Sequence, residues 1–128
     1  MLDQTALDNI RALQRPGQPD LLTRIIETYS RNAEALVSGL HRALQDGDIE
    51  LVRRNAHTLK SAAANLGATA LSELCRQLEE CARSGDIDSG ADLFERLHEE
   101  HERALAALAA ERAAPSDSGK RGNEAASA

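Results

Sequence analysis

Aromatic side chains are nearly absent from this sequence. Phe and Tyr occur once each and Trp not at all, so aromatic residues make up only 2% of the chain. Single-stranded nucleic acids bind on stacking platforms made of such side chains. The formal net charge of −6 argues against nucleic acid as well, because a phosphate backbone needs a clustered positive surface. We therefore expect no nucleic-acid partner.

Long apolar runs are also missing, and cysteine is rare. No run approaches the roughly 20 apolar residues of a membrane span, and no signal peptide opens the chain. Cys75 and Cys81 fall in one predicted helix, about 9 Å apart along its axis and on different faces, which is too far for a disulfide. These absences predict a cytoplasmic protein without membrane association, whose buried thiols stay reduced.

Sequence signals for strands and for several kinds of enzyme are absent too. No alternating apolar run is bounded by hairpin turn residues, so no strand is predicted. The chain has no glycine-rich phosphate loop, which argues against a nucleotide-driven kinase or ATPase. It has no nucleophile in a strained turn either, so hydrolase chemistry is not favoured.

Apolar residues instead recur at helical spacing along five segments. The expected helices are a short one with apolar residues between 2 and 13, a long one over about 20–44, a third from Asp48 to Gly67, a fourth that closes at Gly85, and a fifth from Ser89 to Pro115. The expected start signals are a Thr5–Asp8 capping box, Pro19 as the first residue of the second helix, Asp48 as an N-cap and a Ser89–Asp92 capping box.

This pattern predicts an all-α fold. Short connections force neighbouring helices to be antiparallel, so the four main helices should form an antiparallel bundle with the short N-terminal helix packed on it. At 128 residues the chain is large enough to bury a core without disulfides or metal. We expect one domain over residues 1–114 and a disordered tail over residues 115–128, where no periodic apolar pattern remains.

The most informative helix is the third. Its apolar residues fall at Val52, Ala56, Leu59, Ala63 and Leu66, and they form one stripe along a helix. At about 100° per residue, position 57 lies roughly 140° from that stripe. The sequence therefore predicts that a histidine, His57, points away from the core.

The predicted neighbours of His57 distinguish it from an ordinary solvated histidine. Cationic and small side chains share its outer face: Arg53, Arg54, Lys60, Ser61 and Ala64. A face that served only for solubility would normally have paired Glu and Lys side chains. A bare strip beside an exposed imidazole suits a docking protein. A neutral imidazole is nucleophilic near pH 7, and a cation one turn on, at Lys60, would stabilise a phosphorylated ring.

Residues 56–68 also resemble the signature of histidine-containing phosphotransfer (HPt) domains of bacterial phosphorelays. That signature is a histidine, a lysine three residues on, a small residue next, and a glycine ten past the histidine; here these are His57, Lys60, Ser61 and Gly67. Residues 19–22, 47–48 and 78–79 resemble the family too, and the likeness spans roughly residues 2–110.

The resemblance implies a phosphocarrier without kinase activity of its own. His57 would accept the phosphoryl group, Lys60 would be its charge partner, and Gly67 would be kept bare for the approaching partner. With Arg53, Arg54, Ser61 and Ala64, Gly67 completes the expected docking surface. The implied partners are response-regulator receiver domains, free or in a hybrid sensor histidine kinase, which meet a monomer. No cofactor or metal is expected on this chain, because the Mg²⁺ belongs to the receiver.

Two other classes of function stay open. A helical adaptor could use the same surface without phosphate chemistry, and it would tolerate loss of His57. A metal-binding bundle is the other, because Glu95 and His98 match the Glu-x-x-His spacing of di-iron proteins, with Glu99, His101 and Glu102 nearby. The chain has no second such pair, and we expect His101 to lie at the edge of the core with a satisfied hydrogen bond.

Overall fold

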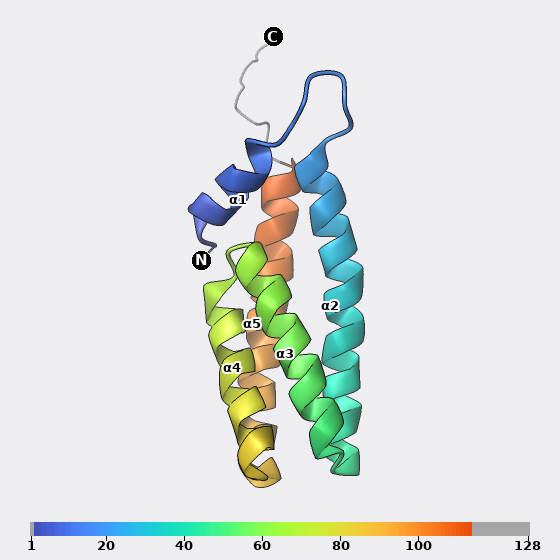
Figure 1. The fold of residues 1–128 in the computed structure, drawn as a ribbon, viewed down its shortest axis with the longest axis vertical. Helices are drawn as coiled ribbons and strands as arrows, with labels where there is room; N and C mark the ends of the chain where they lie inside the picture. The colour runs from blue at the N-terminus through green and yellow to red at the C-terminus, as the bar shows by residue number, and fades with distance from the viewer. Residues whose placement is uncertain (1, 114–128) are drawn as a thin grey trace.

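A computed structural model describes residues 2–113, and all the regular secondary structure in that range is α-helical. The helices are α1 (Gln4–Arg11), α2 (Leu21–Asp46), α3 (Ile49–Asn65), α4 (Thr69–Ser84) and α5 (Ile87–Ala113). Helices α2 to α5 form an antiparallel bundle, and α1 lies at one end of it (Figure 1). The predicted fold class is confirmed. The predicted boundary at residue 114 and the tail over 115–128 lie outside the described residues.

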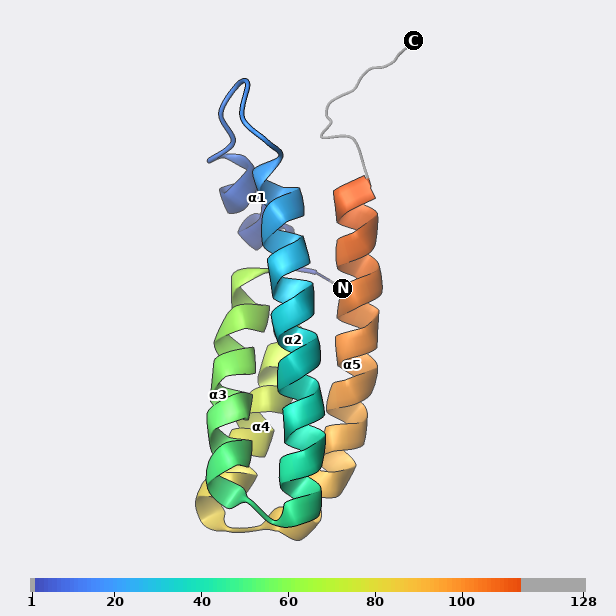
Figure 2. The same cartoon turned by 90° about the vertical axis from the view of Figure 1, so that its right-hand side faces the viewer.

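α1 lies beside the ends of α2 and α5, which are longer than α3 and α4. Turns of two or three residues join α2 to α3, α3 to α4 and α4 to α5, so each helix runs antiparallel to the next. Figure 2 shows that α2 and α5 extend past α3 and α4 at one end. α1 occupies the space beside them, with Leu7 fully buried and Arg11 paired with Glu111 of α5 at 2.6 Å. Leu13, expected on the apolar side of this helix, lies beyond its end and is 67% exposed.

The core follows the predicted stripe of α3. Val52, Ala56, Leu59, Ala63 and Leu66 are each at most 2% exposed, and they pack into the same apolar cluster as buried residues of α2, α4 and α5. Burying this stripe fixes the rotation of α3 about its own axis, because the apolar face must turn inward. The position of every outward-facing residue on α3 follows from that rotation.

Aspartates cap the starts of α1, α2, α3 and α5, and three predicted start signals are wrong. Asp3 caps α1 by accepting from Thr5 N–H, so the helix starts before the proposed Thr5–Asp8 box. Asp20 caps α2, which leaves Pro19 outside the helix. Asp86 accepts from both the N–H and the hydroxyl of Ser89 at the start of α5, which displaces the Ser89–Asp92 box. In each case a short carboxylate just upstream reaches the free N–H groups first. Asp48 caps α3 as predicted.

The two thiols are free, as expected. Cys75 is buried, and this burial raises the pKa of its thiol to about 12, so the group stays protonated. Cys81 was expected to be buried but is only half-buried, because it lies near the end of α4. Within residues 2–113, none of the helices has a stretch long and apolar enough to cross a membrane.

Candidate functional site

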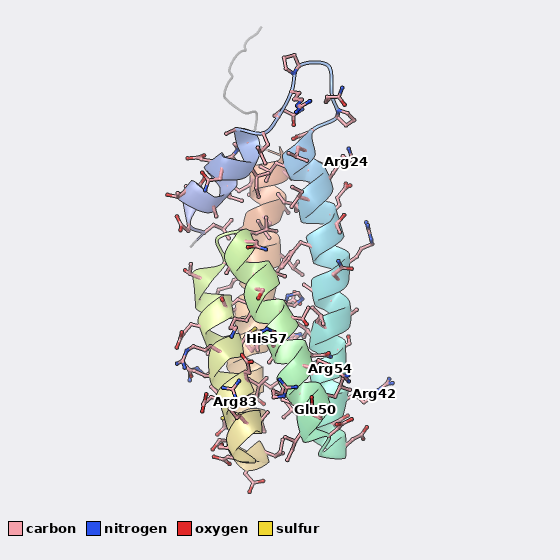
Figure 3. All side chains as sticks on the ribbon, in the orientation of Figure 1. Arg24, Arg42, Glu50, Arg54, His57 and Arg83 are labelled. Carbon is pink, nitrogen blue, oxygen red and sulfur yellow. The ribbon has the colours of Figure 1, made fainter. Side chains whose placement is uncertain are left out.

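His57 lies on the outer face of α3, as its position relative to the apolar stripe predicted. Its side chain is 58% exposed, although Ala56 beside it is fully buried. Figure 3 shows His57 where α3 faces α4, with Arg83 of α4 and Arg54 of α3 toward the same end of the bundle. The imidazole is therefore open to a partner that approaches this side of α3 and α4.

A buried carboxylate holds the ring from below. Glu79 of α4 is only 3% exposed, and its Oε2 lies 2.9 Å from Nδ1 of His57. Its other oxygen, Oε1, accepts a hydrogen bond from Nζ of Lys60 at 2.8 Å. Arg83 donates to Oε2 at 3.4 Å. One carboxylate thus connects the exposed histidine to a lysine one turn further along α3.

Glu79 is ionised at neutral pH. Its hydrogen bond with Lys60 lowers the pKa of the carboxyl most; burial acts in the opposite direction, and the hydrogen bond with His57 lowers it further. An ionised carboxylate only accepts hydrogen bonds, so the ring nitrogen facing it must donate. In neutral His57 the proton then sits on Nδ1, and Nε2 presents its lone pair. This arrangement favours a nucleophilic Nε2.

The predicted docking residues divide into two groups on α3. Ser61 and Ala64 are exposed, and seven residues of helix place Ala64 about 10 Å beyond His57 on the same face. Arg54 is exposed on the other side of His57, whereas the Arg53 guanidinium pairs with Glu50 and is half-buried. The small and the cationic positions thus lie at opposite ends of the exposed face.

Gly67, which was predicted to be kept bare for an approaching partner, lies against the chain's own backbone instead. It is buried, and a Cβ built there would lie 2.5 Å from the backbone oxygen of Asp3. Asp3 N–H also donates to Gly67 O at 2.8 Å. With φ of +80°, Gly67 ends α3 in the left-handed conformation and accommodates the segment before α1. Because Gly67 has no side chain, the backbone of the chain's own N-terminal segment can pack against it.

Sequence reasoning gave Glu79 no role at this site. One signal was available, since Glu79 lies four residues after Cys75 and three before Ala82, both on the buried side of α4. A carboxylate at such a position must find a partner. The sequence could not show that the partners would be His57 and Lys60, because they lie on another helix.

The Glu95–His98 motif on α5 does not form the metal site considered above. The side chain of His98 is 51% exposed, and its Nε2 lies 3.8 Å from Glu102 rather than near a second Glu-x-x-His pair. His101 is fully buried, and neither of its ring nitrogens has a hydrogen-bond partner among the described residues. The expected satisfied hydrogen bond is therefore absent. The nearest oxygen of Glu34, on α2, is 3.6 Å from His101 Nε2.

Comparison with known proteins agrees with this geometry. The family model described as "Hpt domain" matches residues 24–107, which include His57, Lys60 and Glu79. The chain belongs to the Hpt domain family. Membership supports histidine phosphotransfer as its class of activity and confirms the resemblance seen in residues 56–68.

One curated protein and one solved structure are also similar to this Hpt domain. Histidine-containing phosphotransfer protein 2 of Arabidopsis thaliana is 26% identical over 82 residues, which are 62% of this chain. The match spans about half of that relative, 53% of its length. The crystal structure of histidine-containing phosphotransfer protein B (HptB) from Pseudomonas aeruginosa PAO1 superposes with a TM-score of 0.79 at 29% identity, over 87% of this chain and 93% of that one.

Proposed function

We propose that this Hpt domain is a phosphocarrier in a multistep phosphorelay. His57 accepts a phosphoryl group from an aspartate of one receiver domain and passes it to an aspartate of another. The observation that supports this most directly is an exposed imidazole whose Nδ1 is held by an ionised, buried carboxylate. The donor receiver is free-standing or part of a hybrid sensor histidine kinase, and the chain acts as a monomer without kinase activity.

The reaction is a nucleophilic displacement at phosphorus. Nε2 of His57 attacks the aspartyl phosphate in line; the bond between phosphorus and the aspartate oxygen breaks as the Nε2–phosphorus bond forms. The aspartate leaves as a carboxylate. The ring becomes a phosphorylated imidazolium, whose Nδ1 proton stays in the hydrogen bond to Glu79. Attack by the next aspartate reverses these steps, and the Mg²⁺ of the reaction belongs to the receiver.

Lys60 acts as the charge partner in this proposal. Its ammonium lies on the same carboxylate as His57, so Glu79 holds a cation next to the ring. The Lys60 side chain is 30% exposed, and its three donors leave it free to bond phosphate oxygens as well as Glu79. A fixed cation offsets the negative charge that arrives with the phosphoryl group.

The receiver docks over His57 and extends about 10 Å along α3 onto a surface that we call the α1–α3 groove. Residues of α1, α2 and α3 and the segment after α1 line this groove, and its apolar members include Ile10, Leu13, Ile25, Ala62 and Ala64. Its apolar character and the 67% exposure of Leu13 suit a protein partner. Ala64 connects the groove to His57 along one face of α3, with Ser61 between them. Arg54 lies beyond His57, where it faces the negative charge of a phosphorylated receiver.

The decisive experiment incubates the protein with phosphorylated receiver domains and detects acid-labile, base-stable phosphate. We expect wild type to be labelled and His57→Gln to take up none, because glutamine has no nucleophilic nitrogen. His41→Gln is the matched control, since His41 is also exposed but lies on α2, and it should label like wild type. Labelling that persists in His57→Gln refutes the assignment; a receiver that binds both proteins without labelling either supports an adaptor.

A further inference from the structure

His101 is an unusual residue for the centre of a helical bundle. Its side chain on α5 is fully buried, and neither Nδ1 nor Nε2 has a hydrogen-bond partner among the described residues. Burying a polar group without a partner destabilises a protein, so such groups call for an explanation. The phosphocarrier proposal does not use His101, which lies between α2 and α5, whereas His57 faces α4.

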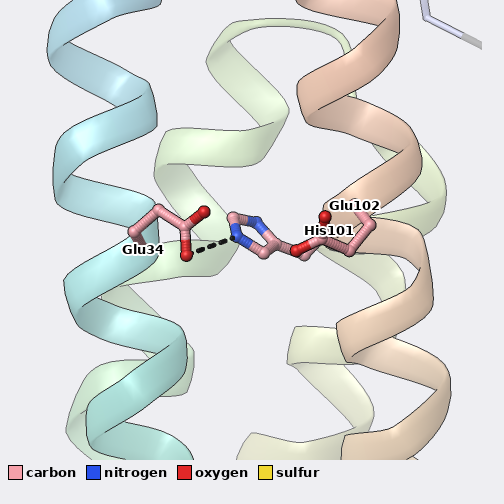
Figure 4. A group of neighbouring side chains, drawn as sticks. All are labelled: Glu34, His101 and Glu102. Carbon is pink, nitrogen blue, oxygen red and sulfur yellow. Dashed lines mark ion pairs between the residues drawn. The ribbon is translucent and has the colours of Figure 1, made fainter.

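The ring faces one carboxylate, and a second lies nearby. Nε2 of His101 lies 3.6 Å from Oε1 of Glu34 on α2, an ion-pair distance that is too long for a hydrogen bond (Figure 4). Glu102, the next residue on α5, completes the group: one donor atom from each of the three side chains lies within 4.8 Å of the others. The side chains of Glu34 and Glu102 are each 58% exposed, so both carboxylates remain accessible from solvent.

We propose that Glu34, His101 and Glu102, the α2–α5 cluster, bind a divalent transition-metal ion such as Zn²⁺. Imidazole and carboxylate are ordinary zinc ligands, and water would take the fourth position of a tetrahedral site. The imidazole selects against Mg²⁺ and Ca²⁺, which take oxygen ligands. Nε2 of His101 would gain the partner that it lacks, and two carboxylates would neutralise the ion.

The geometry requires a small adjustment. Ligand bonds of about 2.0–2.2 Å place tetrahedral donor atoms roughly 3.4 Å apart. The donor atoms, now within 4.8 Å of one another, must therefore move together by about 1 Å. The exposed glutamates can do so by changing rotamer, while His101 stays fixed in the core. No described residue holds Nδ1 of His101, so the site lacks the outer partner that usually orients a ligating histidine, and we expect modest affinity.

Metal binding would join α2 to α5 away from the phosphoryl-accepting face. An ion that binds the folded chain stabilises it by mass action. The proposal is independent of the phosphocarrier function, because no residue of the cluster is part of the His57 site. Failure of either proposal leaves the other standing.

The test uses the full chain, stripped of metal with a chelator and titrated with Zn²⁺ in a calorimeter. We expect one equivalent to bind to wild type, to raise Tm, and to shift the ring signals of His101 in the NMR spectrum. Glu34→Gln and Glu102→Gln should each weaken binding at least tenfold. Glu95→Gln is the matched control, because Glu95 is an exposed acid on the same helix outside the cluster, and it should bind like wild type.

Two results would overturn the proposal. One is the absence of a Tm increase and of any shift in the His101 signals, which would leave His101 as a buried imidazole that faces Glu34 and no ion. The other is Zn²⁺ binding of unchanged affinity in Glu34→Gln and Glu102→Gln, which would place the ion on surface histidines. Both variants change exposed side chains, so the test does not depend on whether a substitution of His101 folds.

Discussion

Glu79 has the most consequences of any single residue in this protein. It is buried and ionised, and it bonds three side chains: Arg83, and the His57 and Lys60 that the phosphotransfer proposal uses. Without it, His57 would be an exposed imidazole free to adopt either tautomer. With it, the ring has one orientation and Nε2 remains the nucleophile. The carboxylate therefore links the stability of the α3–α4 contact to the chemistry of the outer face.

We predict that Glu79→Gln slows phosphoryl transfer about tenfold to a hundredfold. A hydrogen bond to a charged group contributes about 1.5–3 kcal/mol, and about 1.4 kcal/mol corresponds to a factor of ten in rate. Glu80→Gln is the matched control, since the side chain of Glu80 is 61% exposed and its ion pair among residues 2–113 is with Arg83. Rapid-quench measurement of transfer from a phosphorylated receiver checks both. Equal rates for wild type and Glu79→Gln would contradict the orienting role.

The same substitution should alter the pH dependence of stability. The pKa of Glu79 in the folded chain is below its ordinary value of 4.5, so its ion pairs contribute fully above that pH. The contribution is lost as the pH falls through the lower folded-state pKa. We expect the difference in free energy of unfolding between wild type and Glu79→Gln to be larger at pH 7 than in acid. Urea unfolding at both pH values, with Glu80→Gln showing little difference at either, measures it.

At the scale of elements, one face of α3 packs in the core and the opposite face presents His57 to solvent. Its inner face follows a regular apolar repeat, and its outer face combines His57 with the small residues Ser61 and Ala64.

We predict that Ala64→Tyr weakens receiver binding at least tenfold, because a large side chain at this position would fill part of the α1–α3 groove. Ala106→Tyr changes an alanine on α5 that is also exposed, and this variant should bind normally. Calorimetric titration with a receiver checks the pair; equal affinities would place the docking surface elsewhere.

The end of α3 provides a second prediction at this scale. Gly67 and Gly85 both have φ of +80°, but only Gly67 lies against other backbone atoms, those of Asp3. A residue with Cβ in this conformation costs about 1–3 kcal/mol at either site. Gly67→Ala should lose more than Gly85→Ala, because its methyl group also collides with Asp3. Chemical denaturation compares the two. Equal losses would mean that the N-terminal segment does not depend on this contact.

At the scale of the whole molecule, the question is whether α1 folds with the bundle. Leu7 is fully buried, and Arg11 and Gln4 both bond Glu111 near the far end of α5. We predict that Leu7→Ala lowers the free energy of unfolding by about 2–5 kcal/mol, as for other buried leucines. Leu13→Ala, at a 67% exposed site, should change it little. A single unfolding transition with these two values would show one cooperative unit; a small loss for Leu7→Ala would mean that α1 is only loosely attached.

The sequence by itself determined the helical class, the helix order and the outward direction of His57. These follow from local periodicity, because an apolar repeat of 3.6 residues fixes which face of a helix is buried. It also specified Asp48 as a cap, since capping involves neighbours in the chain. The three wrong start signals were errors of a few residues, because the aspartate directly before each helix supplied the cap.

Only the tertiary structure decided which polar side chains on different helices interact with one another. Glu79 belongs to the His57 site because α4 packs against α3, and Glu34 faces His101 because α2 packs against α5. Gly67 is buried for the same reason, because the backbone of Asp3 lies against it. Such pairings join residues far apart in the chain, and the rotation and depth of packed helices set them. No local pattern in a single sequence contains that information.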